Sequence, residues 1–216
     1  RVSESYEHFV FFQIMYKPAM VRSIRFKNVT YVPMYDHVWS NRKKYWRGIG
    51  GFKIYCFSRA IHERVSRLGL TSIYGQYYPA PEAPEINYGH SKPVVYFWQR
   101  TNELTWEHVR CLFAPDDVSK VILNATTDPE HEFVRPSEND MRDYRIQVVS
   151  WFDDRNDYLE ILSQADIVIA PRLREGIGFS TLGAMARGKV VAAADFPTAN
   201  EYISNENGYL FDVENL

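Results

Sequence analysis

A short glycine-containing loop near the end of the sequence holds the residues best suited to chemistry. The run Glu175-Gly176-Ile177-Gly178-Phe179 follows the apolar segment Ile167–Ala170 and precedes an apolar helical pattern that begins near Ser180. Glycines let a ligand approach the backbone, and the N–H groups and dipole of a helix N-terminus favour anions. The loop, Ser180 and Thr181 therefore indicate a phosphate site; a tight strand-to-helix turn without a ligand is the alternative.

The elements that position this loop alternate between strands and helices. Eight short runs rich in β-branched and aromatic residues predict strands, and most are continuous apolar runs typical of parallel strands buried on both faces. Helical patterns lie between several of them, so we predict an α/β fold with doubly wound, Rossmann-like parallel sheets. The runs are His8–Ile14, Val29–Pro33, Lys53–Phe57, Val94–Trp98, Lys120–Asn124, Ile146–Ser150, Ile167–Ala170 and Val190–Ala194.

Four segments carry apolar residues at helical spacing. Ser58 is a candidate N-cap for the first of them, and Gly69 suits the position after its end. The apolar positions are Ile61, Val65 and Leu68; Trp106, Val109 and Phe113; Tyr158, Ile161, Leu162 and Ala165; and Leu182, Met185 and Ala186.

A proline-rich stretch predicts a boundary between two domains. Residues 78–85 contain three prolines, which cannot continue a helix and favour extended backbone before them. We expect a first domain at 1–78, a linker at 79–89 and a second domain at 90–216. The sequence begins with Arg1 and ends just after a predicted strand, so we expect a piece of a longer protein.

The composition excludes several classes of protein. Of 216 residues, 45% are hydrophobic, which is enough for a packed core and excludes a disordered chain. The formal net charge is −2, so no global positive field favours nucleic acid as a partner. The cysteines Cys56 and Cys111 lie in apolar surroundings and are expected to be buried thiols. The six histidines show no metal-ligand spacing, so no metal is expected, and no apolar run is long enough to span a membrane.

The segment from Ala165 to Leu210 resembles the donor-binding core of GT-B fold glycosyltransferases, in particular the retaining family 4, also called glycosyl transferases group 1. The resemblance extends over about 45 residues with many fixed spacings. The matching positions are Ala165-Asp166, Pro171, Glu175–Phe179, Ala184-Met185-Ala186, Gly188, Glu201 and Asn207-Gly208-Tyr209-Leu210. Residues 53–70 are similar to the segment that precedes the family's interdomain linker.

The resemblance implies an enzyme that transfers a sugar from a nucleotide diphosphate donor to a hydroxyl of a glycan or lipid-linked acceptor, with retention and without a metal or other cofactor. Glu175 matches the glutamate that contacts the donor sugar. Arg100 matches the arginine that binds the diphosphate. The backbone of Gly176, Ile177, Gly178 and Phe179 would meet sugar and phosphate, and Ser180 and Thr181 the diphosphate. The chain would comprise a nearly complete C-terminal domain and part of the N-terminal domain.

Three positions depart from the family pattern. Position 183 is glycine where a ribose-binding glutamate is expected, and position 105 is threonine where a lysine is expected. Position 172, usually serine, is arginine. Arg172 or Arg174 is a candidate for the missing positive charge, and a solvated loop residue is the alternative for both. Glu201 is the candidate for the ribose.

The departures keep two further functions open. One is a catalytically silent GT-B-like binding or scaffold module, and the other is another GT-B enzyme such as a nucleotide-sugar epimerase.

Two weaker signals lie in the first domain. Residues 41–53 carry five cations and no acid, with Tyr45 and Trp46 among the cations, which suits an anionic membrane, an acidic acceptor or a solvated basic loop. Asp36 and His37 follow a predicted strand and are candidate acceptor contacts. The resemblance implies a cytoplasmic protein of polysaccharide biosynthesis, and the basic segment adds peripheral contact at the inner face of a membrane as one reading.

Overall fold

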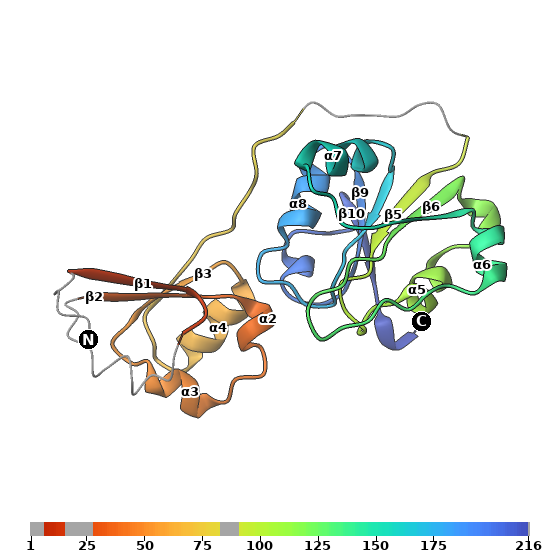
Figure 1. Cartoon of the computed structure of the whole chain (residues 1–216). Coiled ribbons are helices and arrows are strands. Elements are labelled where there is room, and N and C mark those ends of the chain that lie inside the picture. The colour runs from red at the N-terminus through yellow and green to blue at the C-terminus, as the bar shows by residue number, and fades with distance from the viewer. Residues whose placement is uncertain (1–6, 16–27, 83–90, 216) are drawn as a thin grey trace. The chain divides into compact units, whose positions relative to one another are not determined.

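The computed structural model describes residues 7–15, 28–82 and 91–215 (Figure 1). It divides into two compact units: unit 1 comprises Arg1–Tyr77 with Arg174–Ile177, and unit 2 comprises Tyr78–Leu173 with Gly178–Leu216. Each unit is built on a parallel sheet with helices beside it, which confirms the predicted α/β fold class. The stretch expected to be a linker, 79–89, is described only as far as Glu82, and those residues group with unit 2.

Unit 1 contains a four-stranded sheet with the order β1-β2-β3-β4. All three strand pairs are parallel. The elements are β1 (His8–Gln13), β2 (Asn28–Pro33), α2 (Tyr35–Val38), α3 (Lys43–Gly48), β3 (Lys53–Cys56), α4 (Arg59–Arg67) and β4 (Ser72–Tyr74).

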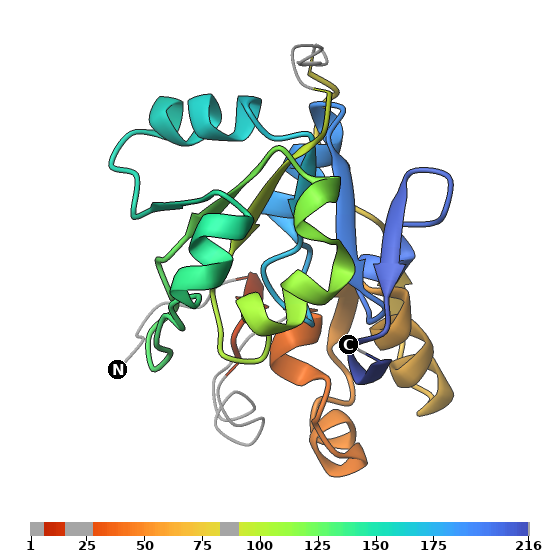
Figure 2. The same ribbon diagram turned by 90° about the vertical axis from the view of Figure 1, so that its right-hand side faces the viewer.

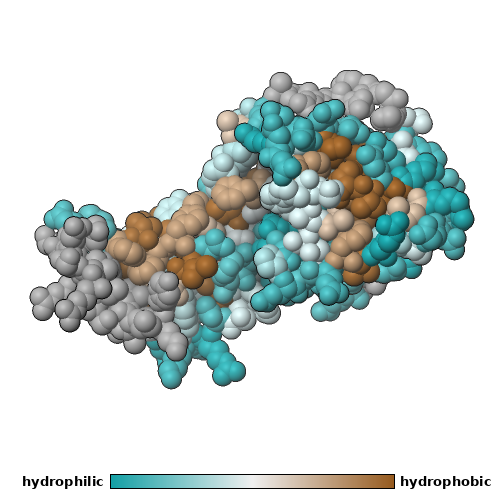
Figure 3. Space-filling view, viewed as in Figure 1, coloured by the Kyte–Doolittle hydropathy of each residue, from teal (hydrophilic) through white to brown (hydrophobic). Residues whose placement is uncertain are grey.

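The core of unit 1 lies on one face of its sheet. Tyr31 and Ile54 from the strands pack with Trp46 of α3 and with Ile61 and Val65 of α4. Alternate residues of the outer strands remain more than half exposed, namely Val10 at 58%, Phe12 at 55% and Ile73 at 62%. Apolar residues accordingly gather over β1 and β2 in the space-filling view (Figure 3).

Unit 2 contains a six-stranded parallel sheet with the order β10-β9-β8-β5-β6-β7. The strands are β5 (Val94–Trp98), β6 (Lys120–Asn124), β7 (Ile146–Val149), β8 (Ile167–Ile169), β9 (Val190–Ala194) and β10 (Gly208–Phe211). The helices are α5 (Trp106–Val109), α6 (Glu138–Asp143), α7 (Arg155–Ser163) and α8 (Phe179–Ala186). Short 3-10 helices are η1 (Arg110–Leu112), η2 (Pro115–Asp117), η3 (Ala199–Glu201) and η4 (Val213–Asn215).

The sheet of unit 2 is buried on both faces, as its continuous apolar strands predict. Along β5, Val95 and Phe97 pack into the cluster that contains Trp106 of α5. Val94 and Tyr96 point the other way, into the cluster that contains Leu162 of α7 and Ala184 of α8. Helices α5 and α6 therefore cover one face, and α7 and α8 cover the other (Figures 1 and 2).

Local differences from the sequence-based expectations have simple causes. The strand β4 has only three residues, too few for a periodic signal. About half of the basic segment 41–53 forms the helix α3. Trp46 of this helix is buried in the core of unit 1, and this packing stabilises the helix. The prediction for Cys111 was wrong: Cys56 is buried, but Cys111 is exposed on η1, where its thiol donates to the carbonyl oxygen of Glu107.

Candidate active site

The strand order of unit 2 creates a switch point between β5 and β8. From β5 the chain moves outward through β6 and β7, and it then returns to the other side of β5 to build β8, β9 and β10. In open parallel sheets, ligands bind outside the carboxyl ends of the strands at such a point, because the loops there diverge. The loops after β5, β6 and β8 therefore frame the candidate site.

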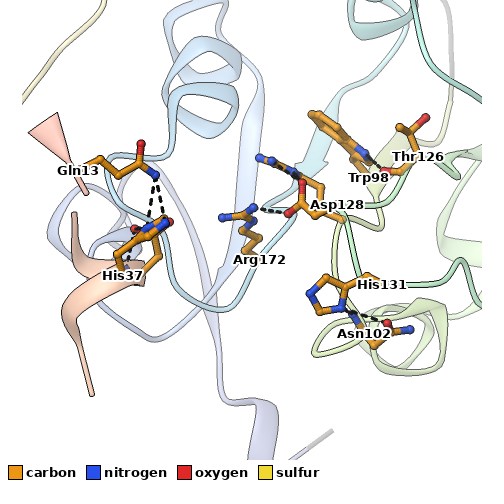
Figure 4. A network of polar contacts seen from close by, with 10 residues as sticks. Gln13, His37, Trp98, Asn102, Thr126, Asp128, His131 and Arg172 are labelled. Carbon is orange, nitrogen blue, oxygen red and sulfur yellow. Dashed lines mark hydrogen bonds and ion pairs between the residues drawn. The ribbon is translucent and has the colours of Figure 1, made fainter. Parts of the chain in front are cut away.

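Each of these three loops contributes a charged side chain to one ion-pair cluster. Arg100 follows β5, Asp128 follows β6 and Arg172 follows β8. Nε and Nη2 of Arg100 donate to Oδ1 of Asp128 at 3.1 and 2.7 Å. Nη2 of Arg172 donates to the other carboxylate oxygen, Oδ2 (Figure 4). One carboxylate thus holds two guanidinium groups side by side, and we call these two residues the arginine pair.

Neighbouring groups fix the arginine pair further. The guanidinium of Arg100 lies 4.8 Å from the centre of the Trp98 ring, a cation–π contact. The backbone N–H of Asp128 donates to the carbonyl oxygen of Arg100 at 2.8 Å. The indole N–H of Trp98 donates in turn to the carbonyl oxygen of Thr126 (Figure 4). The donors of Arg100 are therefore held in place before any ligand arrives.

The cluster keeps a positive charge at the edge of the sheet. Burial by itself would raise the pKa of Asp128, but the hydrogen bonds from Arg100 and Arg172 outweigh it and hold that pKa below its ordinary value. Asp128 is therefore ionised at neutral pH and offsets only one of the two guanidinium charges. The side chains of Arg100 and Arg172 remain 26% and 23% exposed, so an anion from solvent can reach them.

The helix α8 begins in the same set of loops. Its N-cap is Gly178, which adopts the left-handed region with φ of +82°, as the predicted glycine turn requires. The first N–H groups of a helix have no carbonyl one turn earlier to bind, so they favour an anion. The hydroxyl of Thr181 is buried and has no hydrogen-bond partner among the described residues. Ser180 and Thr181 thus offer donors at the start of α8.

The loop between β8 and α8 is divided between the two units. Glu175, Gly176 and Ile177 are buried and belong to unit 1. Arg174 lies there with its guanidinium 4.3 Å from the centre of the Trp39 ring. Of the two arginines proposed to supply the missing positive charge, Arg172 is the one that joins Arg100. The role of Glu175 toward a donor sugar stays a prediction.

The remaining candidate residues occupy other places. Thr105 caps α5, where its backbone N–H donates to Nδ1 of His108 at 3.2 Å, so this position serves local structure. Glu201 ends η3, in the loop after β9. In unit 1, Asp36 and His37 lie in α2, and Oδ1 of Asp36 accepts the backbone N–H of His37 at 3.0 Å. The side chain of Gln13 approaches the His37 ring at 3.4 Å (Figure 4).

Gly183 leaves room for a side chain. A Cβ at this position would meet only Nη1 of Arg187, at 3.7 Å, which is ordinary van der Waals contact. We expect Gly183→Ala to raise the free energy of unfolding by about 1 kcal/mol, because glycine costs about that much relative to alanine inside a helix. Chemical denaturation measures this change. A destabilised Gly183→Ala variant would show that the backbone here needs glycine for another reason.

Asp128 is the residue that sequence reasoning missed. It lies 28 residues after Arg100 and 44 residues before Arg172, so no local pattern links the three. Its position after an apolar run, at the carboxyl end of a parallel strand, is the only signal that could have identified it.

Within the described residues, no group of three or more histidine, cysteine, aspartate or glutamate side chains is arranged to hold a metal ion. None of the helices in the described ranges is long and apolar enough to cross a membrane.

Known proteins resemble the chain in sequence and in structure. The family model described as Glycosyl transferases group 1 matches residues 91–216. No curated protein matches the sequence. A sucrose-phosphate synthase from Thermosynechococcus elongatus superposes with a TM-score of 0.62 at 16% identity, over 91% of this chain and 57% of that one.

Two further solved structures have the same fold. The Anabaena protein HepE, in complex with UDP-glucose, gives a TM-score of 0.61 at 15% identity over 86% of this chain and 58% of its own. A trehalose 6-phosphate synthase from Burkholderia multivorans gives 0.62 at 11% identity over 95% of this chain and 60% of its own. The chain therefore spans less than two thirds of the length of these relatives.

Proposed function

The chain belongs to the family of glycosyl transferases group 1, and on that premise we propose that unit 2 binds the diphosphate of a nucleotide-sugar donor. Transfer of the sugar to a hydroxyl group is the activity we propose for the whole protein. The observation that carries the proposal is the arginine pair, which Asp128 holds at the switch point of a parallel sheet.

The chemistry of the arginine pair suits a diphosphate. Guanidinium groups give paired donors to phosphate oxygens, and two of them match the two phosphate groups of the ligand. A nucleoside diphosphate carries more negative charge than the one carboxylate that now offsets one of the pair's two charges. Ser180 and Thr181 at the start of α8 would add neutral donors to the same anion. Gly178 would keep that helix start free of side chain.

These groups would act most strongly when the donor breaks down. In the proposed reaction the bond between the anomeric carbon and the phosphate oxygen breaks, and a bond from that carbon to the acceptor oxygen forms. The acceptor hydroxyl gives its proton to the departing diphosphate or to solvent, and the diphosphate leaves with the electron pair of the broken bond and so gains negative charge. Arg100 and Arg172 would stabilise that charge as it develops, which lowers the barrier to cleavage.

The finer parts of the proposal rest on the resemblance in sequence. They are retention of the anomeric configuration, contact of Glu175 with the donor sugar, contact of Glu201 with the ribose, and an acceptor that is a glycan or lipid-linked molecule near Asp36 and His37. A cytoplasmic location, a role in polysaccharide biosynthesis and a reaction without metal belong to the same set. Since the HepE structure contains UDP-glucose, UDP and UDP-glucose are the first ligands to test.

The test is an assay of UDP release from UDP-glucose by the protein, with and without added hydroxyl acceptors. We expect release that depends on the acceptor, together with a product that contains the transferred glucose. Binding of UDP without turnover would favour the silent binding module, and conversion of UDP-glucose without an acceptor would favour an epimerase. Absence of UDP binding by calorimetry would contradict the donor site.

A further inference from the structure

A groove of about 800 Å³ lies in unit 1 between α3 and α4. Its lining includes four cations, and among the lining residues they meet a single carboxylate: Arg42, Lys43, Arg64 and Arg67 face Glu63. Two of these cations come from the basic segment singled out in the sequence, but the two on α4 do not. The fold thus assembles a cationic groove that neither segment forms alone.

The cations of the groove are held to different degrees. Arg64 is half-buried, and its Nη1 donates to the carbonyl oxygen of Trp39 at 2.6 Å, which fixes the guanidinium in place. Arg67 forms an ion pair with Glu63 at 2.7 Å, so the carboxylate is already used. Arg42 and Lys43 are exposed and have no carboxylate partner in the described part of the chain. The positive charge of the groove is therefore largely uncompensated.

The aromatic residue of the groove also lacks an acceptor. Trp46 lines the groove with its side chain fully buried. Its indole N–H, which can only donate, has no hydrogen-bond partner among the described residues. A buried donor without an acceptor costs free energy, so the wall of the groove is short of acceptors. A ligand rich in acceptor oxygens would supply partners for the exposed cations of the groove.

We propose that this groove binds a ligand that carries several phosphate groups. Guanidinium and ammonium groups bind phosphate oxygens, and the net positive charge of the lining favours a ligand with more than one negative charge. The volume accommodates several phosphate groups or a phosphorylated headgroup. This site lies in unit 1, whereas Arg100, Asp128 and Arg172 belong to unit 2, so the inference does not rest on the proposed donor site.

The first test measures binding of inorganic tripolyphosphate by calorimetry at low salt. We expect the double variant Arg42→Ala, Lys43→Ala to weaken the affinity by roughly tenfold, because both side chains would contribute charge-assisted hydrogen bonds. The matched control is Lys44→Ala, Arg47→Ala, which removes the same charge from exposed positions of the same helix that do not line the groove. The control should change the affinity by less than about twofold, as a screened surface charge does.

Two further measurements separate the groove from the donor site and a lipid ligand from a soluble one. The effect of Arg42→Ala, Lys43→Ala should persist in an Arg100→Ala background, which separates this groove from the donor site. Vesicles that contain phosphatidylinositol bisphosphate, compared with phosphatidylcholine, distinguish a lipid headgroup with several phosphate groups from a soluble phosphate ligand. Binding of either probe that depends on Arg42 and Lys43 supports the proposal. Equal losses in both double variants, or no binding of either probe at low salt, would overturn it.

Discussion

Replacement of Arg100 by alanine is expected to weaken binding of UDP by about 10- to 150-fold. A hydrogen bond to a charged group contributes about 1.5–3 kcal/mol, and each 1.4 kcal/mol is a tenfold change in affinity. The loss should approach the upper end, because Asp128 and the ring of Trp98 already hold the guanidinium in place. Isothermal titration of the wild type and the variant measures the difference directly.

The same experiment distinguishes the arginines of the loop after β8. Arg172→Ala should weaken UDP binding to a similar degree, since Asp128 holds both guanidinium groups. Arg174→Ala should leave the affinity nearly unchanged, because that side chain lies over Trp39 in unit 1. Arg110→Ala is the matched control in unit 2: this arginine also pairs with carboxylates, Glu107 and Asp140, but it lies on η1. Wild-type affinity in Arg100→Ala would remove the arginine pair from the donor site.

The fold of unit 2 could be predicted because its signals are local and strong. A run such as Val94–Trp98 is apolar at every position, which is typical of a parallel strand buried on both faces. The glycine turn was equally visible, since Gly178 needs a positive φ to start α8. Both features depend on neighbours in the chain and not on the order of the strands.

The chemistry of the site could be predicted only in part, because it depends on that order. Arg100 and Arg172 become neighbours only because β8 pairs with β5, and Asp128 joins them only because β6 lies on the other side of β5. No spacing in the sequence encodes these pairings. Thr105 also differs from the family pattern, but here the explanation is local. The residue caps α5, where its backbone N–H donates to Nδ1 of His108.

Gly208→Ala is expected to destabilise the protein by about 3 kcal/mol, at the upper end of the range for overpacking a filled site. A Cβ at this position would lie 2.6 Å from the carbonyl oxygen of Val191 and 2.8 Å from Cγ2 of Ile203. Gly208 is the register partner of Val191 where β10 pairs with β9, so the clash would push the edge strand away from the sheet. Denaturation monitored by circular dichroism measures the loss.

The same variant tests whether Asn207 and Gly208, the asparagine–glycine pair of the family motif, serve the sheet or contact a ligand. Asn207 orders the turn before β10, because its side chain accepts the backbone N–H of Ser204 and donates to the carbonyl oxygen of Tyr202. Gly208 then lets β10 approach β9 closely, so both residues serve the sheet and neither needs a ligand. Under conditions where Gly208→Ala remains folded, its affinity for UDP should equal that of the wild type. Gly183→Ala is the matched control for stability, since the same substitution meets open space there. A Gly208→Ala variant that is as stable as the wild type but binds UDP weakly would contradict this structural role and place the glycine at the ligand.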